Sequence, residues 1–205
     1  MLKVWGRKTS SNVQALMWGI GELGLPYDRV DIGHVHGGTD TPEFLALNPN
    51  RTVPVLQDGD GPPIWETGAI LRYLASRYAP DPFWPKDIIA RADVDKWAEW
   101  AKLNIASGFG SGIFWRVVRT PAAARDTAAI TAAIAGFETL LAIAEARLTQ
   151  TDFLVGDHLT LADIQFGHVL YRYYDIDIPR GDFPAVKAYY DRLCTRAPYR
   201  SHVMV

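Results

Sequence analysis

The spacing of apolar residues divides the N-terminal part of the chain into short strands and helices. Leu2–Gly6 and Tyr27–Ile32 alternate as strands do, and the apolar residues from Asn12 to Leu23 recur at helical spacing between them. Gly24 and Pro26 stop this helix before the second strand begins. The pattern therefore predicts a β-α-β unit at the start of the chain.

A second group of elements follows a loop that contains His34 and His36. Strands are predicted over Thr52–Gln57 and Pro63–Trp65, joined by a turn rich in glycine and aspartate. The helix after Glu66 carries its apolar residues on one face. The complete order, β-α-β and then β-β-α, is that of a thioredoxin-like domain.

The chain beyond Ala79–Pro82 shows helical spacing and no convincing strand. The predicted helices include Arg91–Ala106, Ala122–Leu148 and a last helix that opens at Pro184. Gly108–Gly112 is predicted to bend or break the first of them. We therefore expect an α+β thioredoxin-like domain over residues 1–79, a linker over 80–86 and an all-α helical domain over 87–205.

Composition and charge exclude several classes of function. The chain is 48% hydrophobic and 21% charged, which is ordinary for a globular protein. Its net charge of -2 and the lack of a long basic run argue against binding to nucleic acid or to an anionic membrane. No apolar run approaches the length of a membrane span, and Met1–Gly6 lacks the apolar core of a secretory signal. Since Cys194 is the only cysteine, no intramolecular disulfide can form, and we expect a cytoplasmic protein.

The segment Asn48–Leu56 contains a Val53-Pro54 step between two strand-like runs. Proline cannot donate to a sheet ladder, and one tolerated in such a place is often a cis-proline in a tight turn. This turn would direct the N–H and C=O of Val53 outward, where they can pair with an extended peptide ligand. About ten residues further along, Glu66-Thr67 opens a helix whose free N–H groups and positive dipole end suit a carboxylate. Together the two elements suit a small acidic peptide; the alternative is a plain N-cap beside a buried turn.

Thr9–Asn12 places hydroxyl side chains where the first strand leads into the first helix. A hydroxyl there can donate a hydrogen bond to a thiolate, and this lowers the pKa of the thiol. The alternative interpretation is that Ser10 to Asn12 only cap the helix, as these residue types favour.

These two sites and a third block, Phe153–Ile164, carry a resemblance that runs over essentially the whole chain. In this order and at these separations the three blocks resemble the cytosolic glutathione S-transferase family, in particular the bacterial theta- and nu-like classes with a serine in the first turn. The resemblance implies glutathione as co-substrate and a symmetric homodimer. It also implies that Thr160–Asp163, which has the spacing of a capping box, serves folding and not catalysis.

The resemblance assigns the thiolate contact to the first turn. Ser10 matches the family's serine best, and Asn12 matches an asparagine found two positions later in some bacterial classes. Thr9 and Ser11 remain alternatives. Neither tyrosine nor cysteine is present in this turn, so the tyrosine and cysteine types of the family are not expected.

The resemblance also assigns the remaining contacts with glutathione. The main chain of Val53 would pair with the cysteinyl backbone, Pro54 would be cis, and Glu66 and Thr67 would hold the γ-glutamyl end. Thr52 stands where the theta pattern has lysine. Arg51 and His36 are therefore the candidates to bind the glycyl carboxylate, and the resemblance does not choose between them.

Aromatic residues after the glycine-rich stretch offer a pocket for an apolar co-substrate. Phe109 and Trp115 are the candidates, whereas Trp97 is assigned to the core. His34 and His36 lack a third ligand, so no metal site is expected. The resulting prediction is a glutathione transferase that conjugates small apolar electrophiles. A glutathione-dependent disulfide reductase and a non-catalytic scaffold are the alternatives, and the electrophile itself is not identified.

Overall fold

Four short strands from the first part of the chain form one mixed sheet in the computed structural model, which describes residues 1–205. The strands are β1 (Leu2–Trp5), β2 (Tyr27–Val30), β3 (Val55–Asp58) and β4 (Ile64–Trp65), in the order β2-β1-β3-β4. β1 and β2 are parallel, and the other two pairs are antiparallel. This topology confirms the predicted thioredoxin-like arrangement.

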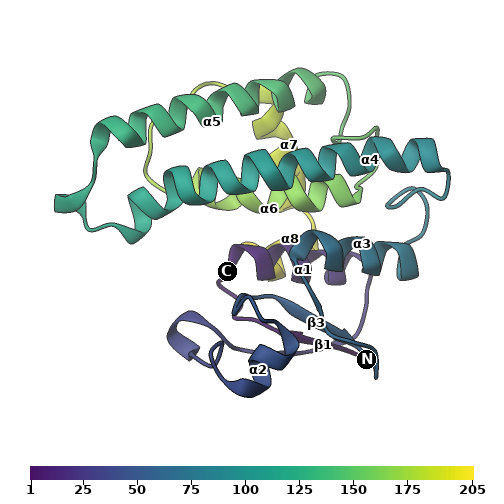
Figure 1. Cartoon of the computed structure of the whole chain (residues 1–205). Helices are drawn as coiled ribbons and strands as arrows, with labels where there is room; N and C mark the ends of the chain where they lie inside the picture. Colours follow the sequence, from purple (N-terminus) through teal and green to yellow (C-terminus); the bar gives the residue numbers. More distant parts are fainter. The chain divides into compact units, whose positions relative to one another are not determined.

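Helices cover both faces of this sheet. In Figure 1, α1 (Ser11–Glu22) and α3 (Thr67–Tyr78) lie on one side of the strands, and α2 (Pro42–Leu47) lies on the other. A three-residue 3-10 turn, η1 (His34–His36), precedes α2. The fully buried side chains of the sheet and of these two helices include Val4, Leu16, Trp18, Ile20, Leu56 and Ile70.

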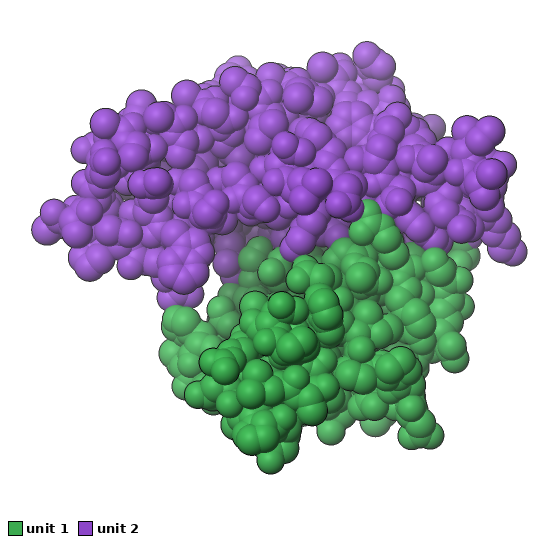
Figure 2. Space-filling model, in the orientation of Figure 1, with its two compact units in different colours: residues 1–80, 196–205 green, residues 81–195 purple.

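The chain divides into two compact units, coloured separately in Figure 2. The first comprises residues 1–80 and 196–205, and the second comprises residues 81–195. The predicted helical domain, 87–205, therefore has to be corrected at its end, because the last ten residues belong to the first unit. They contain α8 (Ala197–His202), which the sequence pattern did not predict.

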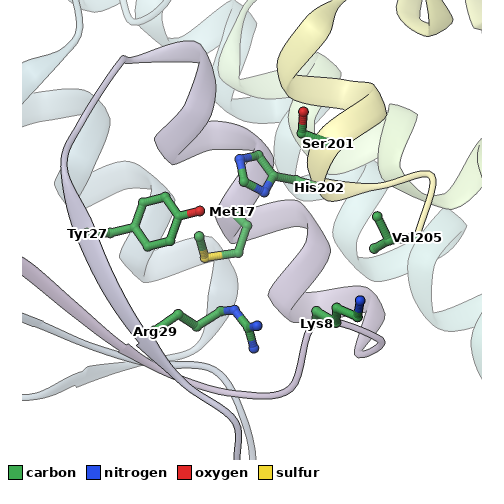
Figure 3. Close-up of a pocket in the computed structure, with 7 residues that line it drawn as sticks. All are labelled: Lys8, Met17, Tyr27, Arg29, Ser201, His202 and Val205. Carbon is green, nitrogen blue, oxygen red and sulfur yellow. The ribbon is translucent and has the colours of Figure 1, made fainter.

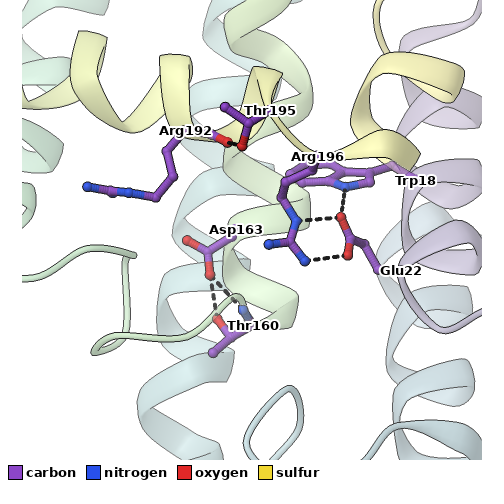
Figure 4. A network of polar contacts seen from close by, with 7 residues as sticks. All are labelled: Trp18, Glu22, Thr160, Asp163, Arg192, Thr195 and Arg196. Carbon is purple, nitrogen blue, oxygen red and sulfur yellow. Dashed lines mark hydrogen bonds and ion pairs between the residues drawn. The ribbon is translucent and has the colours of Figure 1, made fainter.

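α8 is held against α1 by close packing and one carboxylate. Tyr199 is fully buried and meets the ring of Trp18 edge to face, with centroids 4.8 Å apart. Glu22 accepts hydrogen bonds from Trp18 Nε1 at 2.8 Å and from the Arg196 guanidinium at 2.7 and 2.6 Å (Figure 4). Gly21 permits the approach, since a Cβ there would lie 3.0 Å from the Cβ of Pro198.

The second unit is helical throughout. Its long helices are α4 (Ile88–Trp100), α5 (Thr127–Leu148), α6 (Leu161–Asp175) and α7 (Pro184–Cys194), and a short 3-10 turn, η4 (Ala122–Ala124), precedes α5. After α4 the chain continues in π-helical turns, η2 (Ala101–Ala106) and η3 (Gly108–Arg119). The helix is therefore not broken at Gly108–Gly112, so of the predicted bend or break the break is wrong. π-helical turns widen a helix without ending it, and such turns are frequent at functional sites.

α5 is the one helix that is long and apolar enough to cross a membrane by length and composition, with a mean hydropathy of 1.7. The prediction that no apolar run approaches this length is thus wrong by this measure. Alanine supplies much of the hydropathy, and the buried side chains form a single stripe: Ile134, Phe137, Leu141, Ala144 and Leu148. Glu145 accepts hydrogen bonds from the backbone N–H groups of Ala185 and Val186 at 3.0 and 2.9 Å. These contacts join α5 to α7 as one wall of the helical unit.

The predicted capping box at the start of α6 is confirmed. Asp163 is fully buried and accepts hydrogen bonds from the backbone N–H of Thr160 at 2.7 Å and from its hydroxyl at 2.9 Å (Figure 4). Its other oxygen accepts from the N–H of Leu154 and from the Tyr189 hydroxyl, both at 3.0 Å. Every contact of this carboxylate serves the fold of the helical unit.

His168, on the same helix, makes the stability of the protein depend on pH. Burial lowers the pKa of its imidazole to about 3, with a smaller effect from the charge of Lys102. The folded state keeps this ring neutral, whereas the unfolded chain takes up a proton below its ordinary pKa of about 6.5. Stability is therefore lost as the pH falls from 6.5 toward 3.

We expect a decrease from pH 7 to pH 5 to lower the free energy of unfolding by about 2 kcal/mol through His168 alone. Urea unfolding followed by helical circular dichroism at both pH values measures the change. His168→Gln should remove this contribution, because glutamine does not titrate. An unchanged pH dependence in His168→Gln would show that other groups cause it.

Candidate active site

The sheet register brings three predicted site segments to one end of the sheet. Val55 of β3 pairs with Trp5 of β1 on one side and with Trp65 of β4 on the other. The neighbours of these paired residues in the chain are Gly6, Pro54 and Glu66, and each continues past the same end of the sheet. The turn before Ser10, the Val53-Pro54 step and the start of α3 therefore meet there, although they lie far apart in sequence.

Close packing at Gly6 joins the first two of these segments. A Cβ at Gly6, whose φ is +156°, would lie 2.5 Å from Cγ2 of Val13 and 3.3 Å from Cβ of Val53. Only glycine leaves room for such an approach. The turn before Ser10, the first turns of α1 and Val53 thus pack directly against one another.

Ser10 ends the turn and begins α1. Its backbone N–H donates to the carbonyl of Arg7 at 3.1 Å, and its carbonyl accepts from Gln14 N–H at 2.8 Å. It is the N-cap residue of the helix by backbone geometry, but its hydroxyl makes no capping hydrogen bond. Capping alone therefore does not explain this hydroxyl. Ser10 as a residue is 8% exposed, and it lies at the free N–H groups of α1. Asn12, in the first turn of the same helix, is half-buried.

The loop before Val53 is built around Asn48, which is 1% exposed. Its Oδ1 accepts from the backbone N–H of Asn50 at 3.0 Å, and its Nδ2 donates to the carbonyl of Thr52 at 2.9 Å. Arg51 has a positive φ of 58° within this loop. Spacing along the chain predicts no role for Asn48, because its bonds to Asn50 and Thr52 form only in the folded loop.

The Val53-Pro54 peptide bond is cis, as predicted. Pro54 is buried, whereas Val53 is half-buried at the end of the sheet. β3 begins at Val55 and not at Thr52 as predicted, since proline has no N–H for the ladder and the preceding loop turns away. The polar backbone of Val53 therefore lies outside the sheet's own ladder.

Glu66 holds an unusual backbone conformation at the start of α3. Its φ of 70° and ψ of 115° are rare for a residue other than glycine, and its exposed side chain makes no capping hydrogen bond. Residues in such conformations cluster at ligand sites, where the surrounding structure maintains them. Thr67, the first residue of α3, is 2% exposed. The N-terminus of α3 is thus presented at the same end of the sheet.

The candidates for the glycyl end lie around the same loop. Arg51 and Thr52 are exposed, and the Thr52 hydroxyl accepts from Asn48 Nδ2 at 3.2 Å. His36 is exposed in η1, and the preceding Gly33 approaches Val53, whose Cγ1 would lie 3.6 Å from a Cβ at that glycine. All three side chains are therefore in segments that adjoin Val53.

The two aromatic candidates occupy different environments in the helical unit. Phe109 is 3% exposed and packs among the rings of Phe114, Phe137 and Tyr173, so it belongs to the core of that unit. Trp115 is 61% exposed on η3. Of the pair, only Trp115 offers a large open face. No group of three or more His, Cys, Asp or Glu side chains is placed to hold a metal ion.

Comparison with known proteins agrees with this geometry. Residues 9–77 match the family description "Glutathione S-transferase, N-terminal domain", and residues 111–197 match "Glutathione S-transferase, C-terminal domain". The chain is 34% identical over 206 residues to Glutathione S-transferase GstB of Escherichia coli, covering 100% of this chain and 99% of that protein. It is 32% identical over 167 residues to Glutathione S-transferase 3 of Zea mays, covering 79% and 73%.

A solved structure gives the same result. The theta class glutathione S-transferase from Xanthomonas axonopodis pv. citri, with glutathione bound, has a TM-score of 0.93 and 42% sequence identity, over 100% of this chain and 97% of that chain. The predicted fold, with its small mixed sheet and helical second part, is thereby confirmed. The identity over the full length and the shared fold establish that the chain belongs to the glutathione S-transferase family.

Proposed function

We propose that this protein binds glutathione at the end of the sheet and conjugates its thiolate to small apolar electrophiles. The observation that carries the proposal is the register of β1, β3 and β4, which brings Gly6, Pro54 and Glu66 to one end of the sheet. Main-chain pairing, a helix N-terminus and a hydroxyl are then available within one small region. The relatives named glutathione S-transferase, one of them with glutathione bound, support the choice of peptide.

The peptide backbone of glutathione is recognised by the turn at Val53. Its N–H and C=O lie beyond the ladder of β3, so they can pair with the cysteinyl residue as an added strand would. The γ-glutamyl end then reaches the N-terminus of α3. There the Thr67 N–H and hydroxyl bind the α-carboxylate, and the Glu66 carboxylate binds the α-amino group. Arg51, Thr52 or His36 hold the glycyl carboxylate.

The thiol is activated by Ser10. A free thiol with a pKa of about 8.5 is only a few per cent ionised at neutral pH, and the thiolate is the nucleophile. Lowering this pKa by about two units requires roughly 2.7 kcal/mol of preferential stabilisation of the thiolate. A hydrogen bond from the Ser10 hydroxyl, together with the positive end of α1, is of that size. Asn12 assists from the first turn of α1.

The thiolate attacks an electrophilic carbon and forms a carbon–sulfur bond. With an aryl halide the halide then departs; with an activated alkene the other carbon of the former double bond takes up a proton. Positioning of the two reactants adds to the lowered pKa. Trp115, which exposes most of its ring on η3, supplies apolar contact for the electrophile; the buried Phe109 supports this helix from the core. The protein acts in the cytoplasm as a homodimer and needs no metal.

Glu66→Gln tests the γ-glutamyl contact. We expect glutathione to bind about tenfold more weakly, because the charged partner of its α-amino group is lost. Isothermal titration calorimetry on the full chain measures the change. Glu43→Gln is a matched control, since Glu43 is also exposed near the start of a helix but lies in the first turn of α2. Equal affinities in the two variants would contradict the role of Glu66.

Activity assays separate conjugation from the alternatives. The proposal predicts conjugation of glutathione to an aryl halide or an activated alkene, followed by absorbance, at rates above those for a small disulfide. The Asn12 pattern favours a disulfide reductase as second candidate, and faster reduction of a disulfide such as hydroxyethyl disulfide would select it. Calorimetry that detects no glutathione binding would leave the non-catalytic scaffold as the best account.

A further inference from the structure

A cavity in the first unit is lined by none of the residues assigned above to glutathione. It has a volume of about 290 Å³ and is bordered by residues of β2, α1 and α8 and of the turn after β1. Figure 3 shows Tyr27 and Arg29 on one side, Lys8 on the other, and Met17 between them and below His202. About 300 Å³ is the lower end of the range for ligand pockets, so an occupant would have about one ring.

The walls of this cavity are firmly held. α8 is fixed to α1 by the Trp18–Tyr199 contact and by the Glu22–Arg196 ion pair, which is 2.6 Å long. On the opposite side, Arg29 donates to the carbonyl of Gly6 at 2.8 Å and pairs with Asp31. The cavity is therefore preformed, and binding would not require its walls to be ordered first.

The lining combines apolar surface with positive charge. The Met17 side chain and the ring of Tyr27 supply the apolar part, and the Tyr27 and His202 rings lie edge to face with centroids 6.0 Å apart. Lys8 and Arg29 contribute two cations, and no acidic side chain lines the cavity. Arg29 is balanced by Asp31, whereas the ammonium of Lys8 makes no ion pair. Burial and the nearby Arg29 lower the pKa of His202, which keeps its ring neutral at pH 7.

We propose that this cavity binds a small aromatic carboxylate or a similar organic monoanion. The ring of the ligand would lie against Met17 and Tyr27, and its anionic group would face Lys8 and Arg29. This arrangement satisfies both parts of the lining, because apolar walls hold the body of a ligand and a few polar groups fix its orientation. None of the lining residues is assigned to glutathione, so the proposal does not rest on the glutathione site.

Titration of the full chain with benzoate, followed by NMR, tests the proposal. We expect the resonances of the Tyr27 and His202 rings to shift, with a dissociation constant of about 1 mM for so small a probe. Saturating glutathione should leave these shifts in place. Benzamide, which has the same shape without the charge, should bind at least about fivefold more weakly.

A series at Lys8 isolates the role of charge. Lys8 is exposed, so its replacement leaves the core intact. Lys8→Arg should bind benzoate as the wild type does, Lys8→Gln about fivefold more weakly, and Lys8→Glu more weakly still. The proposal would be overturned if benzoate shifted only the resonances of other residues, or if benzamide bound with equal affinity. It would also be overturned if glutathione displaced benzoate, or if the affinities of the Lys8 variants did not follow this order.

Discussion

Ser10→Ala is expected to lower kcat/KM for conjugation about a hundredfold at neutral pH. The variant loses the hydroxyl that stabilises the thiolate, and two pKa units correspond to a hundredfold smaller ionised fraction, or about 2.7 kcal/mol. Glutathione itself should still bind, because Val53, Glu66 and Thr67 are untouched. Steady-state kinetics with an aryl halide, beside calorimetry for glutathione, separate the two effects.

Ser11→Ala is the matched control for this experiment. Ser11 is the next hydroxyl in the chain and the first residue of α1, so both variants remove one hydroxyl at the same helix end. We expect Ser11→Ala to retain most of the activity. A large loss in Ser11→Ala with little change in Ser10→Ala would transfer the thiolate contact to Ser11. A loss in neither variant would leave Asn12 or the helix dipole as the activating group.

Asp163→Ala is expected to have the largest effect on stability, about 3–5 kcal/mol. The fully buried carboxylate accepts four hydrogen bonds, from Leu154, from Tyr189 and twice from Thr160. Its removal leaves these donors without their acceptor in the core, and buried donors without partners are costly. Urea unfolding at neutral pH, followed by circular dichroism, measures the loss.

Asp126→Ala provides the comparison for Asp163→Ala. Asp126 also caps a helix, accepting from the N–H of Ala129 at 2.9 Å, but it is exposed at the start of α5. A cap of this kind contributes about 1 kcal/mol. Similar losses in the two variants would mean that burial adds nothing to the Asp163 cap. The fraction of the Asp163→Ala protein that folds should also retain its kcat, because Asp163 contacts only residues that hold the start of α6 in place.

The sequence predicted those parts of the fold and of the candidate site whose signal is local. The Val53-Pro54 step indicated a cis-proline, and the structure contains one. The capping box at Thr160–Asp163 was likewise readable from spacing, since its partners are three residues apart. The family resemblance extended these local signals to a fold that the sheet order confirms.

Features that depend on distant contacts were missed. α8 is six residues long, too short for a periodic pattern, and it is held to the first unit by distant contacts with Trp18 and Glu22. The π-helical turns continue the helix through Gly108, whereas the glycine-rich stretch predicted a bend or a break. Gly6 and Asn48 position the site through contacts with Val13, Val53 and Thr52, which no spacing along the chain encodes.

The most direct test of thiol activation is the thiol pKa of bound glutathione, measured by ultraviolet absorbance of the thiolate against pH. We predict a pKa about two units below that of free glutathione in the wild type, returning toward the free value in Ser10→Ala. A bound thiol with the ordinary pKa in the wild type, or no glutathione binding at all, would contradict the claim that this protein activates the thiol.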